Sequence, residues 1–318
     1  MNKILESTKF VVNESKYVKI NEGKIDDFCK SFTDEHIKHW LNNSPYNFKN
    51  LNDKEKLHFL LVLNSMSFSY WGNPKWTIEY KNKKYDGAFG MLTTLGRAIE
   101  NNFKILDPNF LAEISKEEFE KILHGSVKIP LFEERWKIIR EVGTVLLQKY
   151  NGNFENILKL ANQDCRKLLD LIINNFPSFE DSSIYKGKKI HFYKRAQLLI
   201  LDIYQVFNGQ GYGKFKNIRE LTACADYKLP QALRRLGILN YNEELAEKVD
   251  NKVEILKDSE EEIEIRANTI WAVELIEQKL KPRISHIDTM HINDRLWLLT
   301  QIKSPNDKPY HLTRTTAY

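Results

Sequence analysis

The chain of 318 residues is long enough to bury a full hydrophobic core, and it fits one large domain or two small ones. Apolar residues make up 42% and charged residues 29% of it, proportions that exclude a wholly disordered chain. Lysine and arginine exceed aspartate and glutamate by 48 to 43, and this mild net charge of +5 suits a phosphorylated small ligand better than a nucleic acid.

The composition also argues against a metalloprotein and a membrane protein. The three cysteines, Cys29, Cys165 and Cys224, are too few and too scattered for a disulfide framework or a zinc site. The eight histidines show none of the spacings that are typical of catalytic metal sites. No apolar run approaches the roughly 20 residues that span a bilayer, and the first residues lack the apolar stretch of a signal peptide. We therefore expect a cytoplasmic protein without a metal ion or a cofactor.

Helical periodicity dominates the chain from its N-terminal part onward. No repeat and no linker rich in proline, glycine or serine interrupts it, so we expect a single domain over residues 1–318. Asp53 is the expected N-cap of the second helix. The pattern predicts α-helices over residues 24–42, 53–67, 86–102, 131–150, 153–175, 191–208, 217–225, 229–239, 260–280 and 289–301.

Two short segments have the alternation of β-hairpins instead. Residues 76–85 place aromatic and β-branched side chains around a polar turn. Residues 184–192 form the second candidate, with Lys186 and Gly187 at the turn. The chain lacks an alternating strand–helix order, a GxGxxG motif and a GxxxxGK[ST] motif, so a nucleotide-binding α/β fold is excluded. The predicted fold class is mainly α, with small β-hairpins.

A single carboxylate, Asp202, lies in the middle of the apolar segment 196–207. A buried carboxylate is costly unless another group pairs with it. Arg195 precedes it by two helical turns, about 10 Å, so the two residues can flank one cavity without direct contact. Asp202 is therefore either an exposed or structural group, or a carboxylate that accepts N–H groups from a polar ligand.

A second candidate acid, Asp226, lies where two helices are expected to meet. Pro230 is tolerated only in the first turn of a helix, so one helix should end near Ala225 and the next should begin around Leu229. Asp226 is then either a simple N-cap or an acid that packed helices hold in place, as a catalytic carboxylate requires. Gly237 suits the end of the second helix.

The C-terminal part offers further candidates. Trp297 is either a core residue or a platform for a ligand, and Asn293 and Asp294 precede it by one turn. The tail over residues 308–318 is rich in aromatic and β-branched residues, which predicts that it is attached to the body of the protein. Residues 67–76, SFSYWGNPKW, are either the edge of the core or a stacking wall for a base.

Several motifs resemble the queuosine salvage family, the queuosine 5′-phosphate N-glycosylase/hydrolases. They are FYKRAQLLILDIYQVFNGQGYGKF, LTACADYKLPQALRRLG and EIEIRANTIWAVELI, together with FSYW, YDGAFGMLTTLGRAIE, IPLFEERWKIIREVG, FPSFED and PYHLTRTTAY. They follow the family's order over roughly residues 8–318. The resemblance implies a fold akin to the helix–hairpin–helix DNA glycosylases. It also implies hydrolysis of queuosine 5′-phosphate, or of queuosine, to release the deazaguanine base queuine.

The resemblance also assigns roles to individual residues. Asp226 of the ADYK motif matches the family's catalytic acid, and Asp202 matches the aspartate of the family's KRAQ…D helix. A buried carboxylate such as Asp202 can accept the paired N–H donors of a guanine-like base. The chain departs from the family pattern at Cys224, Lys228 and Asn293. The cations expected near the 5′-phosphate are Lys194, Arg195 and Arg314. The other residues expected to bind the substrate are Tyr227, Cys224, Asn293, Asp294, Trp297 and His39.

The chemistry of the bond agrees with this assignment. Cleavage of a C1′–N bond leaves positive charge on the ribose, which a nearby carboxylate stabilises or attacks without any metal or organic cofactor. Two alternatives stay open. A DNA glycosylase-like enzyme would need a more basic groove. A non-catalytic queuine-binding protein would keep Asp202 but would not require Asp226. The expected partner is thus a small-molecule substrate, without stable nucleic-acid binding and without a membrane.

Overall fold

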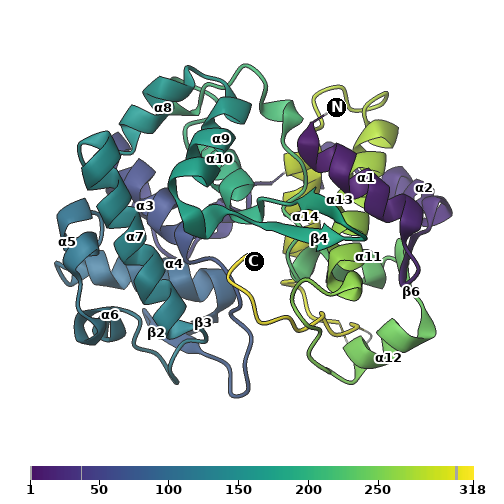
Figure 1. Ribbon diagram of the computed structural model, residues 1–318, viewed down its shortest axis with the longest axis horizontal. Coiled ribbons are helices and arrows are strands. Elements are labelled where there is room, and N and C mark those ends of the chain that lie inside the picture. Colours follow the sequence, from purple (N-terminus) through teal and green to yellow (C-terminus); the bar gives the residue numbers. More distant parts are fainter. Residues whose placement is uncertain (1, 37, 305–306) are drawn as a thin grey trace.

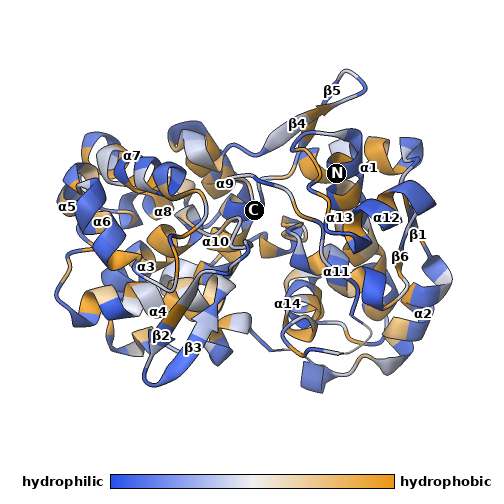
Figure 2. Cartoon of the chain, turned by 90° about the horizontal axis from the view of Figure 1, so that it is seen from below, coloured by the Kyte–Doolittle hydropathy of each residue, from blue (hydrophilic) through white to orange (hydrophobic). Residues whose placement is uncertain are grey.

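The computed structural model describes residues 2–36, 38–304 and 307–318, and the described chain is mainly helical (Figure 1). The helices form two groups that lie side by side, and the C-terminal segment ends between them (Figures 1 and 2). Three two-stranded antiparallel sheets complete this part of the chain. The predicted fold class, mainly α with small β-hairpins, is therefore confirmed.

The middle of the sequence forms the first group. Its elements are α3 (Asp53–Ser65), β2 (Thr77–Tyr80), β3 (Lys83–Asp86), α4 (Gly87–Glu100), α5 (Pro108–Glu113), α6 (Lys116–Ile122), α7 (Phe132–Tyr150), α8 (Glu155–Ala161), α9 (Cys165–Asn175) and α10 (Lys194–Val206). Helix α3 packs against α4, α7 and α10, and α5 packs against α7. The hairpin β2–β3 leads directly into α4, so it fixes where that helix begins.

Both ends of the sequence form the second group. Its elements are α1 (Lys3–Glu14), β1 (Val18–Ile20), α2 (Glu22–Ser31), α11 (Lys228–Arg235), β6 (Leu239–Tyr241), α12 (Glu243–Asp250), α13 (Glu260–Leu280) and α14 (Thr289–Leu299). Strand β1 pairs antiparallel with β6, with Val18 opposite Tyr241. The hairpin of β4 (Ser182–Tyr185) and β5 (Lys188–His191) reaches from the first group onto α1 and α13.

Helix α13 lies inside the second group and carries the polar contacts that align its neighbours. The carboxylate of Glu264 accepts the backbone N–H groups of residues 16–18 and so fixes the start of β1. The guanidinium of Arg266 donates to both oxygens of Asp181, at 2.9 and 2.7 Å. Asp181 in turn accepts the backbone N–H of Lys194 at 2.9 Å. This chain of contacts fixes the first turn of α10 against α13.

Two of the predicted helices are shorter than the apolar pattern suggests. The helix expected over residues 24–42 ends at Ser31, because the guanidinium of Arg283 takes up the carbonyl groups that would continue it. The chain then passes through a 3₁₀ helix, η2 (Trp40–Asn43). Residues 153–175 form α8 and α9 instead of one helix, because Asn162 and Gln163 have the left-handed backbone, with φ of 51° and 64°.

The prediction of a helix over residues 217–225 was wrong. Only a 3₁₀ turn, η6 (Ile218–Glu220), is present, and residues 221–226 form neither a helix nor a strand. The backbone N–H of Thr222 donates to the side chain of Gln197 at 2.8 Å, and that of Cys224 donates to Asn293 at 3.0 Å. Side chains of α10 and α14 therefore replace the hydrogen bonds that a helix would make.

The ends of the helices predicted over residues 53–67 and 229–239 were predicted only in part. The N-cap of α3 is Asn52 and not Asp53. The helix predicted over residues 229–239 ends at Arg235, and Gly237 follows it with φ of 71°, as the C′ position requires. Helices α1, α5, α6 and α12 lie outside the elements that the pattern predicted. Within the described residues, no helix is both long and apolar enough to cross a membrane.

Candidate active site

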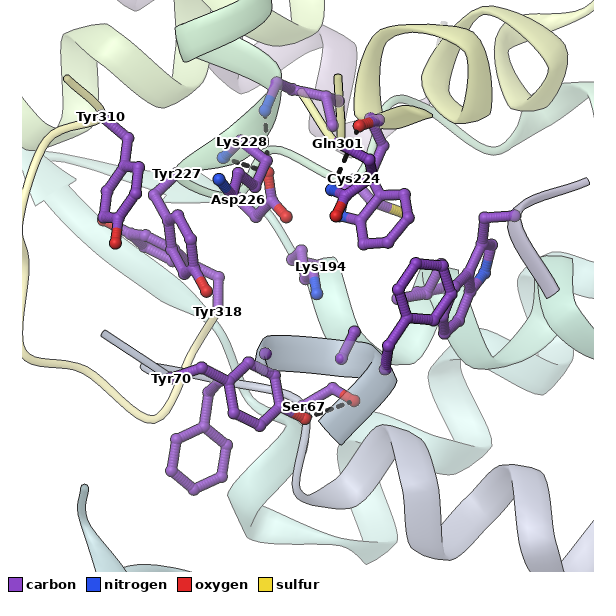
Figure 3. Close-up of a pocket in the computed structure, with 18 of the residues that line it drawn as sticks. Ser67, Tyr70, Lys194, Cys224, Asp226, Tyr227, Lys228, Gln301, Tyr310 and Tyr318 are labelled. Atoms are coloured by element: carbon purple, nitrogen blue, oxygen red, sulfur yellow. Dashed lines mark hydrogen bonds between the residues drawn. The ribbon is translucent and has the colours of Figure 1, made fainter. Parts of the chain in front are cut away.

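A pocket with about 1010 Å³ of empty space, part of it open to solvent, lies between the two groups of helices. Its walls come from the first turn of α4, from α10, from the irregular segment before α11, and from α14. Residues 67–71 and Tyr310 and Tyr318 of the tail complete the walls (Figure 3). The site therefore joins segments from the whole length of the sequence.

Asp226 lines this pocket and also caps α11. Its Oδ1 accepts the backbone N–H groups of Lys228 at 2.7 Å and of Leu229 at 2.9 Å. Its Oδ2 has no hydrogen-bond partner among the described residues and belongs to the pocket wall. The chain before it is anchored, because Arg266 donates to the carbonyl of Ala225. The N-cap and the functional interpretations of Asp226 are therefore compatible, since each uses a different oxygen.

Three aromatic rings form a box at one end of the pocket. The ring centroids of Trp40 and Trp297 are 5.4 Å apart, those of Phe89 and Trp297 are 5.3 Å apart, and those of Trp40 and Phe89 are 6.2 Å apart. All three residues line the pocket. Such a box offers flat apolar surfaces to a ring-shaped ligand. Trp297 thus faces the pocket, whereas the Trp76 of the segment 67–76 is fully buried in the core.

Asn293 and Asp294 lie beside the aromatic box. Asn293 accepts the N–H of Cys224 and donates its amide to Oδ1 of Asp294 at 3.2 Å. The other oxygen of Asp294 accepts the backbone N–H of Trp40 at 3.2 Å and the amide of Gln205 at 3.4 Å. Burial raises the pKa of Asp294 to about 6. A buried carboxyl group with a raised pKa is typical of a functional site.

Asp202 and His39 lie behind the box and are not among the residues that line the pocket. Asp202 is 1% exposed and accepts the indole N–H of Trp40 and the amide of Asn64, both at 2.9 Å. Nε2 of His39 is 3.6 Å from Oδ1 of Asp202. Nδ1 of His39 accepts the N–H of Leu41. In this structure Asp202 therefore orients a wall of the box.

Of the three cations expected near a phosphate, only Lys194 lines the pocket. Lys194 is 6% exposed, and its ammonium has no hydrogen-bond or ion-pair partner in the part of the chain that the structure describes. Figure 3 shows this ammonium pointing into the pocket. The guanidinium of Arg195 is buried against the carbonyl groups of Ser65 and Ser178, and Arg314 is exposed over the ring of Trp71 at 3.8 Å.

The polar side chains of four further residues line the pocket opposite the aromatic box: Lys75, Asp86, Lys228 and Tyr310. The sequence analysis did not predict them as pocket residues. Nζ of Lys75 is 3.0 Å from Asp86. Nζ of Lys228 lies 4.7 Å from the ring centroid of Tyr310, and the Tyr310 ring packs against that of Tyr227 with the centroids 4.8 Å apart and the planes tilted by 39° (Figure 3). Burial lowers the pKa of Lys228. The sequence did contain one signal for this wall. The pair Asp86-Gly87 in the YDGAFG motif is typical of the start of a helix, and α4 begins there.

The first turn of α4 also faces the pocket. Gly87, Ala88 and Phe89 line it, and the side chain of Asp86 makes no capping hydrogen bond to that turn. Its carboxylate pairs with Lys75 instead. Free N–H groups at a helix N-terminus attract anions. No group of three or more potential metal ligands occurs among the described residues.

A carboxylate fixed between two helix groups, an aromatic box and an unpaired ammonium together define a mainly helical protein with a small-molecule site. The sequence profile of the queuosine salvage protein matches residues 46–318, and the chain belongs to this family. It is 37% identical to a Sphaerobacter thermophilus protein, over 99% of this chain and 97% of that one. It is 34% identical to a Nematostella vectensis protein over 98% and 97% of the two chains, and 31% identical to a Bos taurus protein over 98% of each. All three are named queuosine 5′-phosphate N-glycosylase/hydrolase.

Proposed function

We propose that this protein hydrolyses the N-glycosidic bond of queuosine 5′-phosphate, and so releases queuine and ribose 5-phosphate for queuine salvage. The similarity to proteins of that name over nearly the whole chain supports this activity. The placement of Asp226 carries the proposal at the level of chemistry, because one of its oxygens is fixed by backbone N–H groups and the other faces the pocket.

Asp226 acts on the ribose in this proposal. When the C1′–N bond breaks, its electron pair leaves with the base and positive charge develops at C1′. The carboxylate of Asp226 stabilises that charge or attacks C1′, and a water molecule then supplies the oxygen of ribose 5-phosphate. The two N–H groups that hold Oδ1 keep the carboxylate in place, so no reorganisation is needed during the reaction.

The remaining walls suit the two ends of the substrate. The box of Trp40, Phe89 and Trp297 offers an apolar wall to one face of the base, with Asn293 and Asp294 at its edge and Cys224 and Tyr227 beside Asp226. Lys194 and the first turn of α4 hold the 5′-phosphate. An ammonium buried without a counter-charge is costly, so an anionic ligand is the natural partner of Lys194. The substrate is a small molecule in the cytoplasm, and neither nucleic acid nor a cofactor takes part.

Incubation of the purified protein with queuosine 5′-phosphate, followed by chromatography of the free base and the sugar phosphate, tests the activity. We expect both products from the wild type. Asp226→Asn should fold and bind queuine but lose at least about a hundredfold in kcat, as removal of one electrostatic stabiliser does. Binding of queuine without any turnover by the wild type would instead favour a carrier protein. A gel shift with duplex DNA that persists at high salt would favour a nucleic-acid enzyme.

A further inference from the structure

The proposed reaction needs a proton at the base, and Asp226 does not supply it. In a 7-deazaguanine, carbon replaces N7, so the base cannot be protonated at that position as a departing purine can. A base that left as an anion would place an uncompensated charge in a mostly apolar box, which is costly. A proton must therefore reach a nitrogen of the six-membered ring as the C1′–N bond breaks. A side chain at the edge of the aromatic box is the nearest source.

Three other acidic groups that line the pocket are poor proton donors to the base. Asp226 acts on the ribose in the proposed reaction, and Asp86 is half exposed and paired with Lys75. Burial raises the pKa of the Cys224 thiol far above its usual range, so the thiol holds its proton too strongly. Asp294 is the better candidate, because it is a carboxyl group that is 3% exposed, three neighbours hold it in place, and burial raises its pKa to about 6, so it can carry a proton in mild acid and release it.

Trp40 attaches Asp294 to the box. Its backbone N–H donates to Asp294, and its indole N–H donates to Asp202. The same indole is one wall of the box, together with Trp297 and Phe89. The residue that would hold the face of the base thus also holds the carboxyl group at its edge. The three contacts of Asp294 come from α14, α10 and the chain at η2, so its position is fixed from three sides.

Burial, more than the surrounding charges, shifts Asp294 toward its neutral form. Burial and the neighbouring carboxylate of Asp202 on α10 raise its pKa, while His39 before η2 lowers it, and the outcome is a pKa of about 6. Helices α11 and α13 also pack on α14. Their charged groups turn elsewhere, since Arg235 pairs with Asp307 and Glu277 accepts the hydroxyl of Thr289. Lys194 and Lys228 line the same pocket, and neither makes a hydrogen bond or an ion pair with Asp294 in the part of the chain that the structure describes. When two carboxyl groups of one site lie in different environments, the one that is more easily kept protonated is the natural acid and the other is the natural base.

We propose that Asp294 is the general acid that protonates the departing base, while Asp226 acts on the ribose. This inference rests on the proposed function. As C1′–N breaks, the bonding pair stays on the base, and the proton of Asp294 passes to a nitrogen of its six-membered ring. Water adds to C1′ and gives its proton to Asp226. Solvent then removes that proton and restores the one on Asp294, so the net reaction consumes one water molecule.

Asp294→Asn tests the proposal, because it keeps the size of the side chain but cannot give up a proton. With queuosine 5′-phosphate at pH 5.5 we expect kcat to fall by about a hundredfold or more, the usual contribution of a general acid. The kcat of the wild type should fall as the pH rises through about 6, where Asp294 loses its proton, and this dependence should vanish in Asp294→Asn. Loss of kcat with an unchanged melting temperature separates this role from a structural one.

A substrate whose leaving group needs no proton gives the second arm. On 4-nitrophenyl riboside 5-phosphate, Asp294→Asn should keep its rate within about threefold of the wild type, whereas Asp226→Asn should lose about a hundredfold. Equal losses of Asp294→Asn on both substrates would overturn the acid role. So would a wild-type kcat that rises through pH 6, because the ionised carboxylate would then be the active form. If the wild type leaves queuosine 5′-phosphate intact, the proposed function fails as well, whereas turnover with a fully active Asp294→Asn overturns this inference alone.

Discussion

At the scale of single residues, one side chain can serve the fold and the chemistry with different atoms. Asp226 caps α11 through Oδ1 and offers Oδ2 to the pocket. Trp40 does the same with its backbone and its ring, since it fixes Asp294 and forms a wall of the aromatic box. Variants of such residues therefore need a measurement of stability beside each measurement of activity.

Lys194→Met tests the proposed phosphate contact. We expect kcat/KM for queuosine 5′-phosphate to fall at least tenfold, because one charge-assisted hydrogen bond contributes about 1.5–3 kcal/mol. Because free queuosine has no phosphate for Lys194 to hold, its kcat/KM should stay within about twofold of the wild type. Lys189→Met, which removes an exposed ammonium paired with Glu180, serves as the control. An unchanged ratio of the two kcat/KM values in Lys194→Met would assign the phosphate to another cation.

Asp202→Ala separates orientation of Trp40 from direct contact with the base. The substitution leaves the indole N–H of Trp40 and the amide of Asn64 without acceptors in a buried place. Each buried unsatisfied group costs about 1–3 kcal/mol, so we expect a clear loss in the free energy of unfolding, measured by urea denaturation. Calorimetry should then find that the free energy of queuine binding changes by less than the free energy of unfolding does. Normal stability with affinity lost by about 1.5–3 kcal/mol would instead indicate that Asp202 binds the base itself.

At the scale of elements, α10 and α14 hold the chain from Leu221 to Asp226 in an irregular, non-helical conformation. Gln197 on α10 accepts the backbone N–H of Thr222 and donates to its hydroxyl at 3.0 Å. Asn293 on α14 holds Cys224. Since these partners lie far away in the sequence, the short apolar run LTACA cannot reveal by itself that it avoids a helix.

Gln197→Met tests whether this clamp positions the acid. The variant leaves the buried N–H of Thr222 unsatisfied, which should cost about 1–3 kcal/mol of stability in urea denaturation. We also expect kcat to fall more than KM changes, because Asp226 lies only four residues beyond the clamp. Gln278→Met on the exposed face of α13 is the matched control. A destabilised Gln197→Met with normal kcat would show that the clamp serves the fold alone.

At the scale of the whole molecule, the sequence predicts the class of the fold and part of the pocket wall, such as Asp226, Trp297 and Lys194, but not the complete wall. The spacing of apolar residues in α3, α4, α7, α10, α13 and α14 predicts those helices within a few residues. The aromatic box needs Trp40, which lies beyond the point where Arg283 ends the predicted first helix. The wall of Lys75, Asp86 and Tyr310 depends on how the tail packs. Contacts between distant segments therefore decide what local patterns leave open.

The buried tail should make the protein sensitive to acid. His311 is 1% exposed, and burial lowers its pKa from 6.5 to about 3 in the folded protein. The unfolded chain binds a proton at His311 near pH 6.5 and the folded protein does not, so stability falls as the pH drops from 6.5 toward 3. At about 1.4 kcal/mol per pH unit, this residue costs roughly 3 kcal/mol at pH 4.

His311→Gln removes the titrating group and tests this account. Urea denaturation between pH 6.5 and 4 should give the variant a flatter dependence of unfolding free energy on pH than the wild type. The variant starts from a lower stability at neutral pH if it loses the hydrogen bond between His311 and the hydroxyl of Tyr318. Equal slopes in the two proteins would contradict the assignment of the acid sensitivity to His311.

The pocket takes its walls from both helix groups and from the tail. A bound ligand therefore contacts all three and holds them together. A ligand that binds only the folded form stabilises it by RT ln(1 + [L]/Kd), about 2.7 kcal/mol at a hundredfold excess over Kd. This binding free energy stabilises the interface between the two helix groups, which is lost when either group unfolds. The concentration of its ligands in the cell should thus influence how fast the protein is degraded. We expect the ligand-free enzyme to be proteolysed faster than the ligand-bound enzyme.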